Sequence, residues 1–436
     1  MNIKRQIYNE LDRWLSSVTR RPLLVRGARQ VGKSFAIRHW AKQRFDNLLE
    51  INLEEQESLR VIFQRDLSAD RILDNLELAT GVNLRRNGSA LFIDEIQSEP
   101  RALLALRYLY EQCTELPVIA AGSLVEFILE HIGLPVGRVD QLHMKPLGFC
   151  EFLEALNKEH LAAQIFKNDF SKPLAGIAHQ QLLELLRIYY YVGGMPEAVA
   201  AYAQSRELAV VSDIHARLLT GYEDDFQRYS KNSDWAALRT VYHSATNVVG
   251  ESRVKYVRLD RELRGEKVKS ALNLLIKAQV LSKIVSTYAK TLPLKSSVKE
   301  KFFKLIFVDI GLLHHALGFD WRSVDLEDDL TDIRDGAFAE QFVGQELLST
   351  CSINTSRSLY YWYRAEKGSD AEVDYIVNYA GEPTPVEVKS GARGTLKSLS
   401  LYMTTFQPTN GFVLSQRNVE QLESTIFLPL YMACRL

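Results

Sequence analysis

Cysteine is scarce in this chain of 436 residues, which contains only Cys113, Cys150, Cys351 and Cys434. The four are far apart in the sequence and form no C-x-x-C pair, which argues against a zinc ribbon and against a disulfide framework. A reducing compartment fits this use of cysteine best. We therefore expect a cytoplasmic protein.

Long apolar segments are also absent from the sequence. No stretch approaches 18 uncharged apolar residues, and the first 14 residues mix charged with apolar side chains. The sequence therefore predicts no membrane partner and no export signal. A length of 436 residues, 46% hydrophobic and 25% charged, indicates instead a globular protein of two or three domains.

The net charge of −1 hides a strongly basic segment at residues 252–304. This segment contains fourteen lysines and arginines against four acidic residues, an excess of about ten positive charges. Such an excess attracts polyanions whatever the charge of the whole chain. An acidic stretch follows at residues 320–335, and we expect it to be a solvated linker.

A glycine-rich loop follows a short apolar run near the start of the chain. Residues 23–25 are expected to form a buried parallel strand, and the loop has the full G-x-x-x-x-G-K-[ST] spacing. Glycines let backbone N–H groups surround phosphates, and the helix after the loop presents the positive end of its dipole. A chance glycine turn is the alternative, but the strand-to-helix context argues against it. The predicted nucleotide-binding residues are Gly27, Ala28, Arg29, Gln30, Val31, Gly32, Lys33 and Ser34.

Within this loop, Lys33 is expected to contact the β- and γ-phosphates, and Ser34 to give an oxygen ligand to Mg²⁺. A second apolar run, residues 90–93, ends in Asp94 and Glu95. Because open α/β sheets bind ligands at the carboxyl ends of their strands, we assign Asp94 to the Mg²⁺ shell. Glu95 is assigned to polarising the attacking water. Capping of the next helix is the alternative for this acidic pair.

A third predicted strand, residues 117–121, is followed by Gly122 and Ser123. Ser123 would lie at the same edge of the sheet, where it could contact the γ-phosphate or the water. It could equally cap the apolar helix expected at residues 124–130.

These motifs resemble those of the AAA+ ATPases, which implies binding and hydrolysis of ATP with Mg²⁺. More narrowly, the chain is similar to a family of prokaryotic ATPases whose carboxyl-terminal domain is uncharacterised. In that family a Gly-Arg pair and a strand lead to Pro-Leu-x-Phe-x-Glu-Phe, here residues 146–152 after Gly137 and Arg138. The family also has a Gly-Gly-x-Pro-Glu turn, here residues 193–197, for which a helix break is sufficient explanation.

The resemblance implies that Arg138 is an arginine finger, stabilising transition-state charge on the ATP of a neighbouring subunit. The protein would then be a homo-oligomer. A solvated surface arginine is the alternative.

Helical periodicity dominates residues 149–317. Within the basic segment, helices expected at residues 259–263 and 267–279 precede strands expected at 280–285 and 302–308. Two helices followed by a hairpin form a winged-helix pattern, which favours DNA contact. A solvated basic face, or one that docks an acidic protein surface, remains the alternative.

The carboxyl-terminal part resembles the PD-(D/E)xK nuclease fold. Glu340 lies on a predicted helix, Asp374 on a predicted strand, and Glu387 and Lys389 on another strand, where alternate residues face the same way. The resemblance implies that the carboxylates hold Mg²⁺ while Lys389 helps to activate water. The sequence departs from the name of the fold because Asp374 follows Val373, not proline. A surface ion pair in an inactive site is the alternative.

The predicted fold is therefore α/β with three parts. Residues 1–150 are an AAA+ P-loop NTPase domain, residues 151–320 a helical and winged-helix module, and residues 335–436 an α/β nuclease-like domain. The predicted function is ATP hydrolysis coupled to DNA binding and to DNA cleavage. The alternative is an ATP-gated signalling or protein-interaction switch whose nuclease-like domain is inactive.

Overall fold

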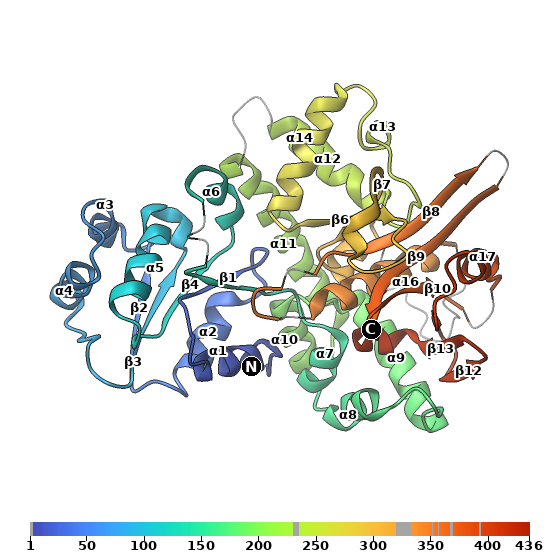
Figure 1. The fold of residues 1–436 in the computed structure, drawn as a ribbon, viewed down its shortest axis with the longest axis horizontal. Coiled ribbons are helices and arrows are strands. Elements are labelled where there is room, and N and C mark those ends of the chain that lie inside the picture. Colours follow the sequence, from blue (N-terminus) through green and yellow to red (C-terminus); the bar gives the residue numbers. More distant parts are fainter. Residues whose placement is uncertain are drawn as a thin grey trace. The chain divides into compact units, whose positions relative to one another are not determined.

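A computed structural model describes residues 3–133, 135, 137–229, 235–319, 333–350, 352–355, 357–366, 369–391 and 394–436 (Figure 1). The chain divides into two compact units. The first, called here the nucleotide unit, comprises residues 4–145 and 351–356. The second, called the carboxyl-terminal unit, comprises residues 1–3, 146–350 and 357–436.

The described part of the nucleotide unit contains one sheet, in the order β2-β3-β4-β1-β5, and every neighbouring pair in it is parallel. Its strands are β1 (Leu23–Arg26), β2 (Asn47–Asn52), β3 (Ser89–Asp94), β4 (Val118–Gly122) and β5 (Asp140–His143). Every residue of β1, β3 and β4 is buried, as expected for the near-continuous apolar strands of a covered parallel sheet. The three strands expected from the sequence are these three.

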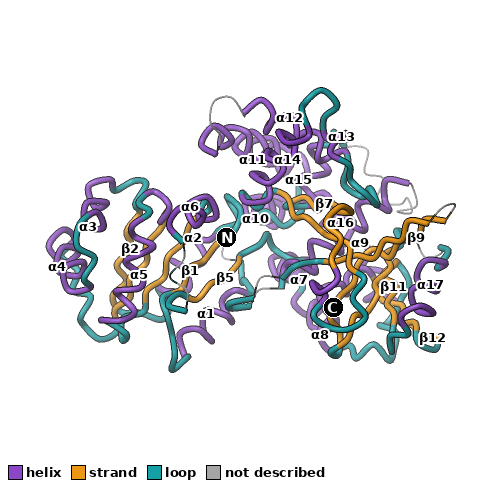
Figure 2. Tube along the Cα trace, turned by 45° about the horizontal axis from the view of Figure 1, so that its top comes forward, coloured by secondary structure: helices purple, strands orange, loops and turns teal. Residues whose placement is uncertain are grey.

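Helices flank this sheet (Figure 2). They are α1 (Ile7–Ser16), α2 (Lys33–Ala41), α3 (Val61–Gln64), α4 (Ala69–Thr80), α5 (Arg101–Gln112) and α6 (Val125–Ile132), with single turns η1 (Glu57–Arg60) and η2 (Ile96–Ser98). The apolar residues of α4 and α5 join those of β3 and β4 in a continuous core. The core therefore fixes the strand ends from which the candidate site is built.

The carboxyl-terminal unit is helical in its first half. Its helices are α7 (Phe149–Ala155), α8 (Glu159–Lys167), α9 (Gly176–Val192), α10 (Pro196–Ser205), α11 (Leu208–Tyr229), α12 (Trp235–Asn247), α13 (Tyr256–Leu259), α14 (Gly265–Lys277), α15 (Ile310–Ala316), α16 (Ile333–Ser349) and α17 (Lys397–Phe406), with turns η3 (Leu294–Ser297) and η5 (Leu430–Arg435). No helix in the described residues is long and apolar enough to cross a membrane.

A mixed sheet completes the unit, with the described strands in the order β12-β13-β11-β10-β9-β8-β6-β7. They are β6 (Leu281–Thr287), β7 (Val298–Phe307), β8 (Tyr360–Glu366), β9 (Ser369–Tyr379), β10 (Glu382–Val388), β11 (Gly411–Ser415), β12 (Glu420–Leu422) and β13 (Thr425–Pro429). The hairpin of β6 and β7 joins the rest of the sheet by a short parallel pairing of Val285 and Ser286 with Tyr360 and Tyr361.

This pairing differs from the division expected from the sequence. The middle module and the nuclease-like domain were expected to be separated at residues 320–335, yet both belong to one compact unit. The physical reason is that a lone two-stranded hairpin is marginally stable, and β6 gains a partner in β8. The helix expected at residues 259–263 is wrong: α13 ends at Leu259, because Asp260 has an extended backbone and its carboxylate accepts from the amides of Glu262 and Leu263. The second helix and the two strands of the winged-helix pattern are present, but the hairpin is part of the large sheet and not a free wing. Most of the expected acidic linker lies outside the described residues.

Two local features of the carboxyl-terminal unit depend on contacts between distant segments. The turn at Gly193 and Gly194 packs so tightly that a Cβ at Gly194 would collide with the carbonyl oxygen of Leu147. The Leu147 amide donates to the Gly194 carbonyl at 2.7 Å. The sulfur atoms of Cys150 and Cys434, both free thiols, lie 3.8 Å apart although 284 positions separate them. Neither contact could be predicted from the spacing of these residues in the sequence.

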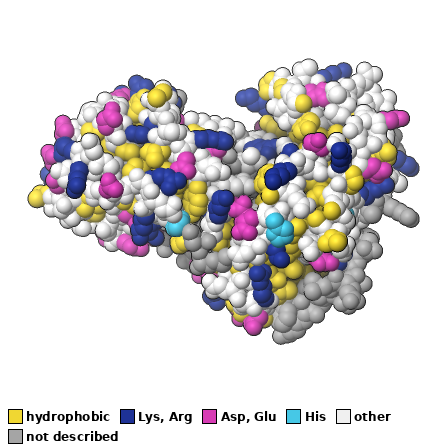
Figure 3. Space-filling model, turned by 90° about the horizontal axis from the view of Figure 1, so that it is seen from below, with side chains coloured by type: hydrophobic (Ala, Val, Ile, Leu, Met, Phe, Trp, Pro, Cys, Tyr) yellow, Lys and Arg dark blue, Asp and Glu magenta, His cyan; other side chains and the backbone are white. Residues whose placement is uncertain are grey.

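The molecular surface drawn in Figure 3 carries lysine, arginine and acidic side chains interspersed with one another and with apolar ones. This distribution is ordinary for a globular protein surface. The face shown has no large area in which all charged side chains have the same sign.

Candidate nucleotide site and carboxylate cluster

The phosphate loop, residues 27–34, connects the buried strand β1 with helix α2. Gln30 and Gly32 adopt left-handed backbone conformations, with φ of 62° and 87°. A Cβ at Gly27 would collide with the carbonyl oxygen of Met144, so only glycine fits there. The loop therefore has the compact backbone that a phosphate-binding turn before a helix N-terminus requires.

Lys33 is the first residue of α2, and its side chain folds back under the loop. The residue is 7% exposed, and its ammonium donates to the carbonyl oxygens of Gly27 at 3.0 Å and Ala28 at 2.8 Å. Burial lowers the pKa of Lys33 to about 8, although the nearby carboxylates of Glu95 and Asp94 act in the opposite direction. The loop thus holds a buried cation by neutral backbone acceptors.

Asp94 ends strand β3 and lies beside the loop. It is 4% exposed, and burial raises its pKa, whereas a hydrogen bond from Ser34 lowers it. The Ser34–Asp94 hydrogen bond shows that the two oxygens predicted to bind Mg²⁺ meet. Their oxygen donor set is the one that Mg²⁺ prefers.

Glu95 follows with a left-handed backbone, φ 47°. Its carboxylate accepts a hydrogen bond from the side-chain amide of Gln97, and its amide donates to Asp94 Oδ1 at 3.0 Å. Burial raises the pKa of Glu95. The Glu95 carboxylate lies near Lys33 at the carboxyl ends of the strands, and the hydrogen bond from Gln97 fixes its position.

Ser123 comes directly after β4, and β4 lies between β3 and β1 in the sheet. Ser123 is buried, and the strand before it has the strands that lead to the acidic pair and to the phosphate loop as its two neighbours. Sequence reasoning missed Gln97, whose side chain packs so closely that a Cβ at Gly122 would collide with it. No pattern in the sequence marks Gln97, because its role depends on the neighbouring strand.

Arg138 lies at the amino ends of the parallel strands, whereas the phosphate loop lies at their carboxyl ends. It comes just before β5, which begins at Asp140 and runs parallel to β1. Its Nε donates to Glu111 Oε1 at 2.8 Å, and Arg107 donates to the same oxygen at 3.1 Å. The side chain of Arg138 is 47% exposed. It therefore does not join Lys33, Asp94 and Glu95 within the nucleotide unit.

A second group of acidic side chains forms in the carboxyl-terminal unit. This carboxylate cluster consists of Glu340 on α16 and of Glu372 and Asp374 on β9, with ligand oxygens within 4.8 Å of one another. Lys304 of β7, 1% exposed, donates to Glu340 Oε1 at 2.7 Å, contacts Glu372 and lies 3.4 Å from Asp374 Oδ1. The centre of the cluster is therefore occupied by an ammonium group.

The charges of this cluster shift the proton affinities of its members. Burial opposes the charge of Lys304, but the surrounding carboxylates prevail and hold its pKa well above the usual value. Burial raises the pKa of Glu340 to about 8, against the opposing effect of Lys304. The sequence predicted Glu340 and Asp374 but missed Glu372 and Lys304. Glu372 could have been found, since it lies two positions before Asp374 on the same strand face.

Glu387 and Lys389 adjoin the cluster from β10 and the residue after it. Lys389 Nζ donates to Glu387 Oε1 at 2.7 Å, whereas Glu387 Oε2 is buried and has no hydrogen-bond partner among the described residues. Burial raises the pKa of Glu387 to about 7, and the negative charge of Asp374 adds to the effect. Asp374 Oδ2 accepts from the Val388 amide at 2.7 Å. The structure thus brings all four predicted nuclease-site residues together.

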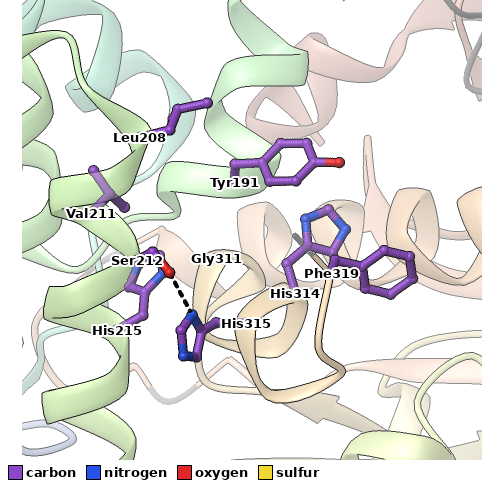
Figure 4. A pocket seen from close by; sticks show the side chains of 9 residues that line it. All are labelled: Tyr191, Leu208, Val211, Ser212, His215, Gly311, His314, His315 and Phe319. Atoms are coloured by element: carbon purple, nitrogen blue, oxygen red, sulfur yellow. Dashed lines mark hydrogen bonds between the residues drawn. The ribbon is translucent and has the colours of Figure 1, made fainter. Parts of the chain in front are cut away.

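A histidine-lined pocket lies among α9, α11 and α15 (Figure 4). His215 bonds to the Val192 carbonyl oxygen, and Ser212 lies within hydrogen-bond distance of His315. Burial lowers the pKa of His215 to about 4 and that of His314 to about 3, so both rings are neutral near pH 7. The space of about 20 Å³ suits little more than one water molecule. We interpret this pocket as a small gap in the packing between the three helices and not as a binding site.

Three segments of the chain match known families. Residues 19–153 match a family described as "AAA domain". Residues 183–323 and 335–432 match two families, each described as a domain of unknown function (DUF8612 and DUF4143). No curated protein matches the sequence. The match to the AAA domain agrees with the parallel sheet and the phosphate loop of the nucleotide unit.

Among solved structures, the chain is similar to three proteins at low identity. The Orc1 protein of Aeropyrum pernix in complex with DNA is 14% identical, over 72% of this chain and 91% of that one, with a TM-score of 0.28. The RuvB Holliday junction branch migration motor of Thermotoga maritima is 15% identical, over 69% and 93%, with a TM-score of 0.29. The Hsp104–ADP complex of S. cerevisiae is 15% identical, over 64% and 39%, with a TM-score of 0.30.

Proposed function

We propose that the nucleotide unit binds ATP with Mg²⁺ and hydrolyses it. The observation that carries this proposal is the meeting of the phosphate loop with the acidic pair, made visible by the Ser34–Asp94 hydrogen bond. Lys33 and the loop amides would hold the phosphates, and Ser34 and Asp94 would hold the metal ion. Bound Mg²⁺ would supply neutralisation of phosphate charge.

Glu95 would orient the attacking water. Phosphoryl transfer depends on a well-placed nucleophile, and Gln97 fixes the Glu95 carboxylate at the site. Ser123 follows β4, the strand between those that lead to the two motifs, and would contact the γ-phosphate or the water. The alternative was that Ser123 caps the following helix; α6 begins at Val125, and Leu124, not Ser123, is its N-cap residue.

The Glu95→Gln variant tests this assignment. We expect it to bind ATP with nearly unchanged affinity and to hydrolyse it at least about 100-fold more slowly, because water orientation is lost. Lys33→Ala should lose nucleotide binding, and Lys42→Ala, at the exposed end of α2, should behave like the natural protein. ATP turnover and fluorescent nucleotide binding measure both properties. Rapid turnover by the Glu95 variant would remove Glu95 from the mechanism.

Arg138 is proposed to act on the nucleotide of a second subunit. Arg138 lies at the amino ends of the strands, away from the phosphate loop, and therefore cannot reach a nucleotide bound to its own subunit. Its side chain is exposed and is available to the nucleotide of a neighbouring subunit. The shared bond to Glu111 is an exposed ion pair, which costs little to break. Turnover per subunit should therefore rise with protein concentration and fall in Arg138→Ala but not in Arg107→Ala. Turnover independent of concentration would exclude this role.

The basic face of α14 supports DNA as a second partner. Lys267 and Lys269 are exposed on it beside Ser270 and Asn273, while Val268, Ala271, Leu272 and Leu275 are buried. The segment between β6 and β7 adds exposed lysines. Replacing Lys267 and Lys269 by glutamine should weaken duplex DNA binding and flatten its salt dependence, because fewer counterions are released. The matched control replaces exposed Lys158 and Lys167. Equal, salt-insensitive behaviour of both variants would favour an acidic protein partner.

Two readings of the carboxyl-terminal unit remain as proposals. The gathering of Glu340, Asp374, Glu387 and Lys389 supports a nuclease-like site. The Lys304 ammonium within the same cluster favours the second reading, an ATP-gated switch whose nuclease-like part does not cut. DNA cleavage assays with Mg²⁺ separate them, and cleavage lost in Lys389→Ala would support the first.

A further inference from the structure

We propose that the ammonium group of Lys304 is the resident cation of the carboxylate cluster and replaces the divalent ion that a nuclease-like site would hold. The carboxyl-terminal unit then binds no Mg²⁺ at this position and does not cleave phosphodiesters. This inference deepens the non-cleaving reading given above and does not depend on ATP hydrolysis.

The first argument is geometric. A Mg²⁺ ion lies about 2.1 Å from each oxygen ligand, so its ligand oxygens lie within about 4.2 Å of one another. The oxygens of Glu340, Glu372 and Asp374 have nearly this spacing, within 4.8 Å. Lys304 Nζ already occupies the space between them, 2.7 Å from Glu340 Oε1 and 3.4 Å from Asp374 Oδ1. A divalent cation in the same space would be repelled at close range by the ammonium.

The second argument concerns which oxygens remain for a metal. Glu340, Glu372 and Asp374 each direct one oxygen to Lys304, and the other oxygen of Asp374 accepts from the Val388 amide. Glu387 directs one oxygen to Lys389. Within the described parts of the chain, Glu387 Oε2 is the one oxygen of Asp374 and Glu387 that has no hydrogen-bond partner. The pair of carboxylates predicted to hold Mg²⁺ thus offers a single free oxygen, which does not fit a metal site.

The third argument is that Lys304 cannot move away. The residues after it on β7 are buried, it pairs with Ile284 of β6, and its ammonium lies 5.0 Å from the centre of the Tyr361 ring. Its own exposure is 1%. An ammonium buried without acidic partners, or carboxylates buried without a cation, would be strongly destabilising. The lysine and the cluster therefore stabilise one another as a fixed set.

The test is a titration with Mn²⁺ in the absence of nucleotide. The full chain should bind no Mn²⁺ that depends on Asp374, whereas Lys304→Met should gain one such site per chain. Asp374→Asn in the Lys304→Met background should abolish the gained site. The control Lys301→Met removes an exposed lysine from the same strand and should gain nothing. Electron paramagnetic resonance and calorimetry both measure the bound ion.

Thermal unfolding gives a second readout for the case in which Lys304→Met folds poorly. Mn²⁺ should raise the melting temperature of Lys304→Met and leave that of the natural chain unchanged. Binding of Mn²⁺ to the natural chain that disappears in Asp374→Asn would overturn the proposal, as would Mg²⁺-dependent DNA cleavage that requires Glu387. Both of these outcomes are measured on proteins that keep Lys304, so they do not depend on whether Lys304→Met folds. ATP turnover of the same samples reports on the nucleotide unit separately.

Discussion

Two buried lysines of this protein, Lys33 and Lys304, lie beside carboxylates but have opposite partners. Lys33 donates to backbone carbonyl oxygens of the phosphate loop, and its pKa is lowered to about 8. Lys304 donates to carboxylates, and its pKa is raised well above the usual value. The difference shows that the partner, and not burial alone, decides whether a buried lysine is available to an anionic ligand.

The two arrangements also differ in what could replace the bonds. A phosphate oxygen is a stronger acceptor for an ammonium than a neutral carbonyl oxygen, so a nucleotide can take over Lys33. The partners of Lys304 already carry negative charge and come from α16 and β9. Lys33 is therefore available to bind an anionic ligand, whereas Lys304 is a structural residue of the carboxyl-terminal unit.

The largest effect that tests this comparison is on stability. Lys304→Met should lower the free energy of unfolding by about 3–5 kcal/mol, because it leaves buried carboxylates without a cation. Lys33→Met should change it by less than about 1 kcal/mol, since methionine removes a desolvated charge that has no bonded carboxylate partner. Urea unfolding without nucleotide or divalent ions measures both. Similar losses in the two variants would contradict the distinction drawn between them.

A smaller effect is expected in the pH dependence of ATP affinity. A phosphate binds the protonated form of Lys33, and the lowered pKa means that the side chain loses its proton above about pH 8. Affinity should therefore be nearly flat below about pH 7 and fall about tenfold from there to pH 9, where about a tenth of the lysines remain protonated. Equilibrium binding of a fluorescent ATP analogue measures this change. Glu95→Gln should keep the decrease, because it removes a group that favours the charged lysine.

The nucleotide site was predictable because its parts are short and contiguous. Residues 27–34 carry their own turn geometry, and Asp94 and Glu95 end an apolar strand whose place follows from the topology of parallel sheets. Gln97 was not predictable. Its contact with Glu95 requires the left-handed backbone at position 95 and the close approach of Gly122 on the next strand.

The carboxylate cluster was half predictable. Local strand patterns predicted Asp374 on one strand and Glu387 and Lys389 on another, and the helical pattern placed Glu340 on a helix. Lys304 was counted only as part of the basic segment at residues 252–304, together with Lys299 and Lys301, which are exposed. Its burial depends on segments that come later in the sequence, because α16 and β9 supply its carboxylate partners and β8 supplies the ring of Tyr361. Such nonlocal pairing leaves no signature in a local charge pattern.

The pairing of β6 with β8 has a practical consequence for anyone who wishes to study the two families of the carboxyl-terminal unit apart. Severing the chain between residues 319 and 333 would expose one edge of β6 on the first fragment and one edge of β8 on the second, and it would separate Lys304 from Glu340. Each fragment would then present an open edge that invites aggregation. Co-expression of both fragments, with recovery as a complex, is the format in which these halves should be handled.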